Sequence, residues 1–343
     1  MLPKKIIVCN TIHPFMTGGS ELFTNKLVEE LNRAGHNAIL VTMPFILKFN
    51  KESLEKTCKP WIDLNLSKLA DVVIPLRFPT WLVNHPNKVV YLNHQLRIAY
   101  DLYDKPYGPK HSEIAFEASK YVAKMDRSLA NAKKIFAVSK NVQSRLKQYS
   151  GIESELLYHS LPNEELHYPG TYGDYILSVG RLVPMKRVDL LIKAMALTKT
   201  PVRCMIVGEG ADRPRLEKLI EDLNVKNKVE LTGWVLPERL IDLYAHSLCS
   251  FYAPVDEDYG LVTLESFKSA KPVITTQDAG GVLEFVKHDI NGWVFPEDAE
   301  MFARAMDTLY LNRELACTMG KAGLESVEHI NWKNCIKRLE EYF

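Results

Sequence analysis

Short runs of β-branched residues alternate with longer stretches of helical periodicity along the whole chain. Such alternation is typical of parallel strands with helices on both faces of the sheet, and it predicts an α/β fold. In the first half we expect strands at residues 5–10, 38–42, 72–75, 89–93, 135–139 and 155–158, and helices at 21–34 and 112–130. In the second half we expect strands at residues 175–179, 204–207, 229–231, 248–252, 272–275 and 292–295.

The alternation lapses between residues 159 and 173, where two prolines and two glycines occur. This segment is the expected linker, because irregular Pro- and Gly-containing stretches commonly separate domains. A chain of 343 residues is long enough for two cores, so we expect lobes at residues 1–165 and 172–330. Ligands of parallel sheets bind beyond the carboxyl ends of the strands, which places the chemistry in strand-to-helix loops and a substrate in a cleft between the lobes.

Composition and charge narrow the functional classes. Hydrophobic residues make up 46% and charged residues 25%, which is ordinary globular usage and excludes a disordered chain. The net charge of +1 gives no argument for a nucleic-acid partner. The segment Lys110 to Lys147 nevertheless holds nine basic and three acidic residues, which predicts an anionic partner such as a lipid phosphate or a membrane surface. A solvated helix face is the alternative for this segment.

The six cysteines are scattered without the two-residue spacing of metal sites, and we expect buried thiols. The apolar run near the start is too short for a signal peptide, and no segment reaches the ~18 apolar residues of a membrane span. These features predict a cytoplasmic protein, peripheral at the inner face of the membrane if the basic segment binds lipid.

A first candidate anion site follows the expected strand at residues 175–179. Gly180 leaves room for a close backbone approach, and Arg181 and Lys186 frame the start of a helix, whose free amides attract anions. The helix itself is indicated by an apolar stripe at Val188, Leu191, Ile192 and Met195. The arrangement predicts a phosphate site, whereas the alternative is that both cations are solvated loop residues.

A second candidate site lies between two carboxylates, Glu257 and Glu265, which are separated by seven residues. A helix beginning near Gly260 would leave the amides of Gly260, Leu261 and Val262 unpaired between the two carboxylates. Carboxylates accept hydrogen bonds from vicinal hydroxyls, so a ligand with a diol, a pyrophosphate and another diol fits, as in a nucleotide sugar. The alternative is that Glu257 caps the helix and Glu265 lies on its wet face.

Five motifs in the second half, in this order, resemble those of glycosyltransferase family 4: Gly180-Arg181-Leu182 through Lys186, Val207-Gly208-Glu209-Gly210, Thr232-Gly233-Trp234, Glu257 to Glu265, and Gly280-Gly281-Val282-Leu283-Glu284. The first half resembles the family more loosely. It contains Gly18-Gly19-Ser20-Glu21 after the first strand, where the family usually reads Gly-Gly-Ala-Glu, and a histidine after a strand, His94.

The resemblance implies a GT-B architecture, in which two Rossmann-like doubly wound lobes face an interlobe cleft. It implies that the C-terminal lobe binds a nucleotide-sugar donor, that the N-terminal lobe binds the acceptor, and that a last helix at residues 331–343 crosses back to the first lobe. By position, the implied donor contacts are Arg181 and Lys186 to the pyrophosphate, Glu265 to the ribose, Glu257 and His94 to the sugar, Gly18 and Gly19 near the distal phosphate, and the Trp234–Val235 backbone to the base.

The resemblance further implies a hexosyltransferase that retains anomeric configuration by front-face attack, with UDP as the expected nucleotide and GDP next. A covalent mechanism stays open, although the sequence offers no nucleophile distinct from Glu257. We expect neither a cofactor nor a metal, because Asp256 and Asp258 mimic a metal motif but overlap the Glu257 motif.

The acceptor candidates are Arg97, Tyr100 and Asp101, in a stretch that resembles some transferases that build bacterial surface polysaccharides. The implied acceptor is a glycan or a lipid-linked molecule. Alternatively these residues simply start a helix, and His94 is a structural histidine.

Rival functions fit less well. A nicotinamide-dependent dehydrogenase needs Gly-x-Gly-x-x-Gly, and Gly208-Glu209-Gly210 lacks the third glycine. A two-lobed solute-binding protein would normally be exported. A catalytically inactive or phosphorylase-like relative on the same fold is the main alternative.

Overall fold

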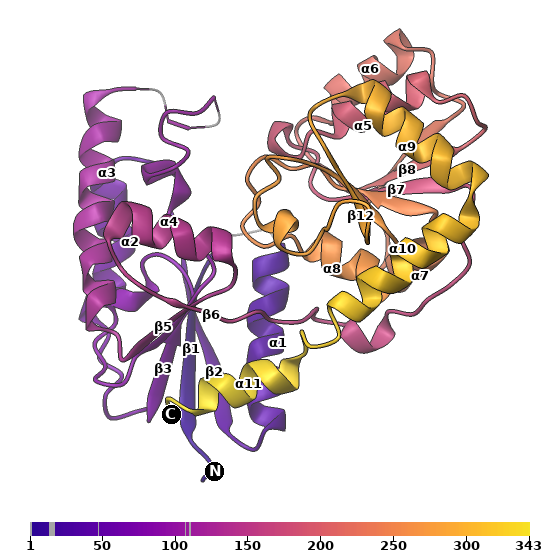
Figure 1. Ribbon diagram of the computed structural model, residues 1–343. Coiled ribbons are helices and arrows are strands. Elements are labelled where there is room, and N and C mark those ends of the chain that lie inside the picture. Colours follow the sequence, from indigo (N-terminus) through magenta and orange to yellow (C-terminus); the bar gives the residue numbers. More distant parts are fainter. Residues whose placement is uncertain (1, 14–17, 47, 107, 110) are drawn as a thin grey trace. The chain divides into compact units, whose positions relative to one another are not determined.

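A computed structural model describes residues 2–13, 18–46, 48–106, 108–109 and 111–343 (Figure 1). Contacts divide the chain into two compact units. The first unit comprises Met1–Pro162 and Ile330–Phe343, and the second comprises Asn163–His329. The division falls within the linker that the sequence suggests, a few residues before the expected end of the first lobe at residue 165, and it assigns Ile330–Phe343 to the first unit.

The strands of the first unit run parallel and form two short sheets in the orders β2-β1-β3 and β4-β5-β6. Parallel bridges between Val73 and Lys88 and between Arg77 and His94 join β3 to β4, so the strands follow the flavodoxin-like order 2-1-3-4-5 with β6 added. Their bounds are β1 Lys5–Ile12, β2 Asn37–Pro44, β3 Val72–Pro75, β4 Val89–Leu92, β5 Lys134–Ala137 and β6 Glu155–Leu156.

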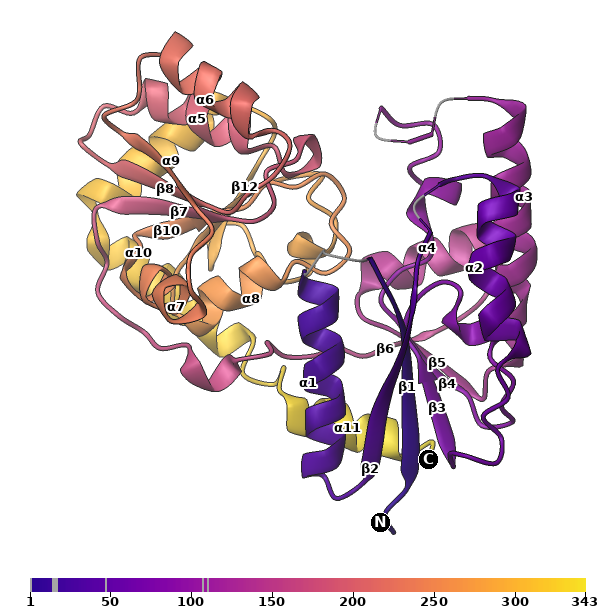
Figure 2. The same ribbon diagram turned by 180° about the vertical axis from the view of Figure 1, so that it is seen from behind.

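Helices cover both faces of this sheet. In both views α1 and α11 lie on one side and α2 and α3 on the other (Figures 1 and 2). Their bounds are α1 Gly19–Arg33, α2 Lys51–Asp63, α3 Glu113–Asp126, α4 Lys140–Ser150 and α11 Trp332–Glu340, with short 3-10 turns at Thr80–Leu82, Arg97–Ala99 and Arg127–Asn131.

The C-terminal helix α11 is held on the first unit by its apolar face and by charge. Trp332 and Leu339 are buried, and the Trp332 indole donates to the carbonyl of Leu161 at 2.8 Å. Arg338 donates to both carboxylate oxygens of Glu155 at 2.6 and 2.7 Å. The last helix therefore packs against the β6 strand of the first unit.

The second unit holds a six-stranded parallel sheet in the order β12-β11-β10-β7-β8-β9. Read from β9, this is the strand order of a Rossmann fold, 3-2-1-4-5-6. The strand bounds are β7 Tyr175–Val179, β8 Arg203–Val207, β9 Val229–Gly233, β10 Cys249–Phe251, β11 Val273–Thr276 and β12 Gly292–Phe295. The α/β prediction is thus confirmed in both units.

Helices α5, α6 and α9 lie on one side of this sheet, and α7 and α8 lie on the other (Figures 1 and 2). The helix bounds in this unit are α5 Val188–Leu197, α6 Arg213–Asp222, α7 Pro237–His246, α8 Leu261–Lys268, α9 Ala299–Leu311 and α10 Arg313–Ser326. The apolar stripe of α5 is buried as expected, with exposures of 0 to 6% at Val188, Leu191, Ile192 and Met195.

Two expected helix bounds differ from those observed, for local reasons. The helix after Lys186 begins only at Val188, because Arg187 has a left-handed φ of +49° that interrupts helical geometry. The helix expected at 112–130 ends at Asp126 and continues as a 3-10 turn. Among the residues that the structure describes, no helix is both long and apolar enough to cross a bilayer.

Candidate functional site

The second unit has its topological switch point between β7 and β10, the neighbouring strands at the centre of the sheet. The chain leaves β7 toward β8 on one side, and β10 leads to β11 on the other. Loops from the carboxyl ends of such strands diverge and open a crevice, where ligands of this fold bind. The two sequence motifs with Lys186 and Glu257 both occupy these loops, so the topology brings them together.

Lys186, Tyr252 and Glu257 form a compact cluster at this point. The Lys186 ammonium donates to the Tyr252 hydroxyl at 2.9 Å and pairs with the Glu257 carboxylate. The Tyr252 hydroxyl donates to the same Glu257 oxygen at 2.9 Å. Burial, followed by the charge of Glu257, raises the pKa of Tyr252 well above its usual value, which keeps this hydroxyl protonated as a donor. Glu257 therefore does not cap the helix, and Lys186 is not a solvated loop charge.

Glu265 lies in the second turn of α8 and is partly buried, not on a wet face. The Tyr244 hydroxyl, from α7, donates to its carboxylate at 2.6 Å. Burial raises the pKa of Glu265, whereas the hydrogen bond from Tyr244 lowers it. The charges of Glu257 and Glu265 both raise the pKa of Tyr252, so the two carboxylates act on the same small region.

The N-terminus of α8 lies between the two carboxylates in sequence. Gly260 adopts a left-handed φ of +90° there, and a Cβ at this position would lie 2.9 Å from Val282 Cγ2. Only glycine adopts this conformation without strain, which explains the residue. The first amides of a helix have no intrahelical acceptor, so those of Leu261 and Val262 are available to an anion.

The other predicted donor residues of this unit follow β7 and β9. Gly180 comes directly after β7, and Gly208 approaches it so closely that a Cβ on Gly208 would lie 1.9 Å from the Gly180 carbonyl oxygen. Arg181 is exposed and does not join the cluster around Lys186. Trp234 is 70% exposed, whereas Val235 packs against a buried cluster.

Arg187 is a residue that the sequence analysis missed. Its side chain is 9% exposed and donates to the carbonyls of Ala253 and Pro254, at 2.8 and 2.9 Å, in the loop that leads to Glu257. It also donates to Thr276 Oγ1 at 2.7 Å and to both carboxylate oxygens of Asp278, at 2.6 and 2.9 Å. A further ion pair joins it to Glu297. Arg187 thus holds the loops after β10 and β11 together.

Those two loops also pair through their backbones. The amide of Glu257 donates to the carbonyl of Ala279 at 3.2 Å, and the amide of Gly281 donates to the carbonyl of Glu257 at 2.7 Å. The Gly280-Gly281 motif is therefore a support for the Glu257 loop. The one sequence signal for Arg187 was that it is a second basic residue, directly after Lys186. The partners of Arg187 lie too far along the chain to be predicted from spacing.

In the first unit, Gly18 and Gly19 stand at the start of α1. The Gly18 amide donates to the carboxylate of Glu21 at 3.0 Å, and Arg77 donates to the other oxygen of Glu21 at 3.0 Å. Arg77 also bonds to Thr11, at the end of β1. Burial lowers the pKa of Arg77, although Glu21 opposes this shift. The carboxylate of Glu21 and the buried guanidinium of Arg77 therefore lie near Gly18 and Gly19.

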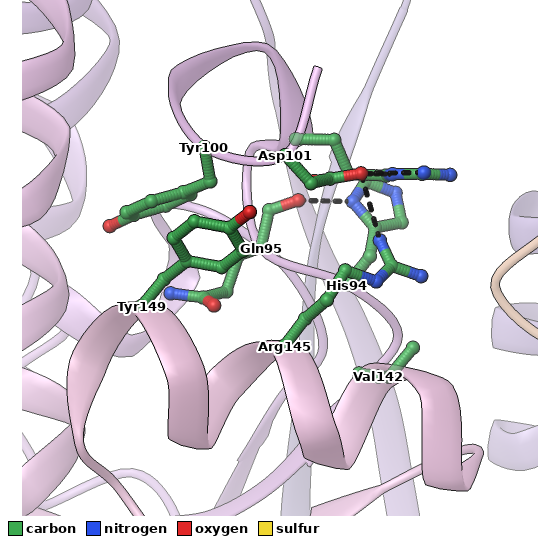
Figure 3. A pocket seen from close by; sticks show the side chains of 8 residues that line it. His94, Gln95, Tyr100, Asp101, Val142, Arg145 and Tyr149 are labelled. Carbon is green, nitrogen blue, oxygen red and sulfur yellow. Dashed lines mark hydrogen bonds and ion pairs between the residues drawn. The ribbon is translucent and has the colours of Figure 1, made fainter. Parts of the chain in front are cut away.

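His94 follows β4, and its Nδ1 lies 2.6 Å from the Gln95 carbonyl oxygen. Arg97 donates to Asp101 through Nε at 2.9 Å and Nη2 at 2.6 Å, and the Tyr100 hydroxyl donates to buried Asp126 at 2.7 Å. Residues Arg97–Ala99 form only a 3-10 turn, so this stretch does not start an α-helix. The structure brings His94, Arg97, Tyr100 and Asp101 together around one pocket (Figure 3).

Several cations of the basic segment from residue 110 to Lys147 are paired with carboxylates. Lys110 lies outside the described residues. Lys134 pairs with Glu155, Lys147 with Glu153, and Arg145 with Asp101. Other cations of the segment are exposed, and they include Lys124, Arg127 and Lys140.

The Asp-Glu-Asp triplet around Glu257 belongs to the loop after β10. Asp256 has a φ of +44°, and its amide donates to the carbonyl of Asp278 at 2.8 Å. No group of three or more His, Cys, Asp or Glu side chains positioned for a metal ion occurs within the described ranges. The triplet forms part of the loop after β10, with Glu257 at its centre.

The second unit matches known proteins. Residues 170–326 match the family model described as glycosyl transferases group 1, which confirms the resemblance read from the five motifs. An uncharacterized glycosyltransferase of Methanocaldococcus jannaschii is 33% identical over 168 residues, which cover 47% of this chain and 42% of that protein. The chain spans between 42% and 60% of the length of the first three curated relatives that it matches.

Solved structures resemble the whole chain. Sucrose-phosphate synthase from Thermosynechococcus elongatus superposes with a TM-score of 0.80 at 20% identity, over 98% of both chains. Alr3699/HepE from Anabaena, in complex with UDP and glucose, superposes with a TM-score of 0.73 at 16% identity, also over 98% of both chains. At these identities the likeness establishes the fold alone.

Proposed function

Because residues 170–326 belong to the glycosyl transferases group 1 family, we propose that this protein is a retaining glycosyltransferase that moves a hexosyl unit from a nucleotide sugar to an acceptor. One observation carries the proposal. Lys186, Tyr252 and Glu257 form a hydrogen-bonded cluster at the switch point of the second unit, next to the free amides at the start of α8. Cationic donors beside a carboxylate suit a ligand that has a diphosphate and a sugar.

We propose the donor contacts that the family resemblance implies by position. Lys186 and Arg181 would contact the diphosphate, together with the amides of Leu261 and Val262. Glu265 would accept hydrogen bonds from the ribose, and Glu257 from the sugar hydroxyls. UDP is the proposed nucleotide, which agrees with the UDP bound by the Anabaena neighbour. Trp234 and Val235 would supply the backbone that meets the base, and Gly180 would permit the close approach.

The reaction breaks the bond between the anomeric carbon and the diphosphate, so negative charge develops on the leaving oxygen. Preorganised donors stabilise such charge, and each contributes ~2.7 to 4 kcal/mol. Lys186, Arg181 and the helix amides supply positive charge of this kind, and we propose that transfer needs no added metal. Addition of EDTA should leave the rate unchanged; loss of transfer with rescue by Mn²⁺ would contradict this.

For the first unit, we propose that it binds the acceptor, a glycan or a lipid-linked molecule, with His94 near the reacting sugar and Gly18 and Gly19 near the distal phosphate. Arg97, Tyr100 and Asp101 would contact the acceptor. The exposed cations around Lys124 and Lys140 are proposed to allow peripheral binding to an anionic membrane surface, where each basic residue contributes about 1 kcal/mol. Vesicle sedimentation with and without anionic lipid tests this association.

A thermal-shift panel tests the donor assignment. UDP, GDP, ADP and their sugars are added separately to the purified chain, and a ligand present at 100 times its dissociation constant should add ~2.7 kcal/mol of stability. We expect UDP compounds to give the largest shift. Glu265→Gln should reduce the shift, because the variant removes the proposed ribose acceptor.

Glu221→Gln is the matched control, because Glu221 is an exposed acid on α6 of the same unit. Its nucleotide-induced shift should equal that of the wild type. Absence of a shift with every nucleotide, or an unchanged shift in Glu265→Gln, would contradict the donor assignment. Release of free nucleotide in the presence of a suitable acceptor then separates an active transferase from an inactive binder.

A further inference from the structure

Tyr252 belongs to the cluster with Lys186 and Glu257, but no sequence motif gives it a role. It directly follows β10, and its amide donates to the carbonyl of Ile274 on β11 at 2.9 Å. The residue is 5% exposed, so neighbouring groups surround its ring. The hydroxyl therefore enters the cluster from a fixed strand end.

The Tyr252 hydroxyl bridges two opposite charges. It accepts a hydrogen bond from the Lys186 ammonium at 2.9 Å and donates one to Glu257 Oε2 at 2.9 Å. Lys186 and Glu257 also pair directly, and Lys186 Nζ lies 5.2 Å from the centroid of the Tyr252 ring. A hydroxyl has one donor and two acceptor lone pairs, so it can serve a cation and an anion at the same time.

The hydroxyl is not needed to fill space. A phenylalanine ring would occupy nearly the same buried volume, and a buried hydroxyl costs free energy unless it is hydrogen-bonded. Both partners of this hydroxyl are charged, and hydrogen bonds to charged groups are stronger than those between neutral groups. The side chains of Lys186 and Glu257 are 18% and 23% exposed, so the hydroxyl contacts groups that a ligand can reach from solvent.

A diphosphate would change the partners of Lys186. The ammonium is a strong donor to phosphate oxygens, so an arriving diphosphate competes with Glu257 for it. If Lys186 turns to the diphosphate, Glu257 loses its direct ion pair, and a partly buried carboxylate without a donor is unfavourable. The Tyr252 hydroxyl can continue to donate to Glu257 and to accept from Lys186. It therefore lowers the cost of the exchange.

We propose that Tyr252 is a positioning residue, whose hydroxyl lets Lys186 pass from Glu257 to the diphosphate of the donor while Glu257 stays hydrogen-bonded. The inference rests on the proposed function in taking the diphosphate to be part of a nucleotide sugar. Lys186 contacts the ligand, and Tyr252 acts through Lys186. Removal of the hydroxyl should therefore weaken the binding of diphosphates and leave the binding of a nucleoside unchanged.

The test separates the diphosphate from the rest of the nucleotide. UDP, GDP, inorganic pyrophosphate and uridine are titrated separately by calorimetry into the wild type and into Tyr252→Phe. We expect the variant to bind UDP and pyrophosphate about tenfold or more weakly, as for the loss of a hydrogen bond to a charged group, and to bind uridine as the wild type does. A general distortion of the site would weaken uridine as much as UDP.

Tyr175→Phe is the matched control. The Tyr175 hydroxyl donates to the carbonyl of Leu243 at 2.7 Å, and Tyr175 begins β7, at the end of the strand away from the cluster. This variant also removes one hydroxyl with a hydrogen bond from the second unit. It should bind all four probes as the wild type does.

A second arm tests whether the effect passes through Lys186. In a Lys186→Ala background, Tyr252→Phe should change the affinities for UDP and pyrophosphate by less than about twofold, because residues that act through one contact are not additive. Unchanged or tighter diphosphate binding in Tyr252→Phe, an equal loss for uridine, an equal loss in both backgrounds, or no diphosphate binding by the wild type would each overturn the inference. Pyrophosphate binding that depends on Tyr252, without binding of UDP or GDP, would support the role of Tyr252 and contradict the nucleotide-sugar function.

Discussion

Arg187 offers the sharpest test of how the candidate site is built. The residue combines an unfavourable left-handed backbone, with φ of +49°, and a side chain that bonds to two loops at once. We consider two substitutions that remove the guanidinium and differ only in the Cβ atom. Arg187→Ala leaves a Cβ on the left-handed backbone, whereas Arg187→Gly has no Cβ there.

The loss of stability depends on whether each hydrogen-bond partner of the guanidinium can bond to water once the guanidinium is removed. Asp278 and Glu297 have side chains that are 55% and 52% exposed, so they regain water, and each of these ion pairs contributes at most about 1 kcal/mol. The carbonyl of Ala253 and the hydroxyl of Thr276 belong to residues that are 1% and 0% exposed. An unsatisfied buried acceptor costs about 1 to 3 kcal/mol, so we expect Arg187→Ala to lose about 2 to 4 kcal/mol.

The glycine variant should lose about 1 kcal/mol less than the alanine variant, because a left-handed conformation costs roughly 1 to 2 kcal/mol with a Cβ and little without one. Both variants should loosen the loop that carries Glu257. A displacement of about 1 Å at a catalytic group costs roughly 10²-fold in rate, so turnover should fall by a similar factor in both. A shared loss of turnover would show that the guanidinium positions the loop.

Urea denaturation followed by circular dichroism measures the stability, and hydrogen exchange of residues 253–257 measures the loop. Arg203→Ala is the control, because it removes an exposed ion pair with Asp174 in the same unit and should change stability by less than about 1 kcal/mol. A stability of Arg187→Ala within about 0.5 kcal/mol of the wild type would refute the energetic reasoning. Equal stability of the alanine and glycine variants would refute the backbone part of it.

Three further predictions concern charge and pH. Lys186→Ala and Arg181→Ala should each lower turnover by about 10²-fold or more in steady-state assays, since we propose that both cations contact the leaving diphosphate, and near-normal rates in both would reject that assignment. Tyr244→Phe should raise the pKa of Glu265, because it removes a hydrogen bond to the carboxylate, so the acid limb of UDP binding should move to higher pH in titrations of the dissociation constant; an unmoved limb would contradict this. Burial raises the pKa of Asp126 from 3.8 to about 6, so the folded state binds its proton more tightly and loses up to about 3 kcal/mol of stability as pH rises between these values. Asp126→Asn should therefore exceed the wild type in thermal stability at pH 7 but not at pH 4, and a difference that is the same at both pH values would exclude this origin.

The local sequence pattern was sufficient for most of the fold. Strands at residues 72–75, 175–179 and 292–295 lie where the β-branched runs predict them, because each run is short and ends at residues that favour turns. The apolar stripe after Lys186 predicted the buried face of α5 for the same reason. The starts of helices were predicted less accurately. Helix α5 begins two residues later than expected, because Arg187 has a left-handed backbone conformation.

The sequence by itself determined the α/β class, the family resemblance of the second half and the motifs around Lys186 and Glu257, because these depend on residue type and on spacing within one loop or helix. Only the tertiary structure decided which groups meet. Lys186 and Tyr252 are 66 residues apart, Arg187 and Asp278 are 91 apart, and their contacts exist because β7, β10 and β11 are neighbours in the sheet. The pairing of Arg97 and Arg145 with Asp101 likewise depends on how α4 packs beside β5 and β6. Strand order and helix packing are set by burial of the whole core, and that free energy is not contained in any short stretch of sequence.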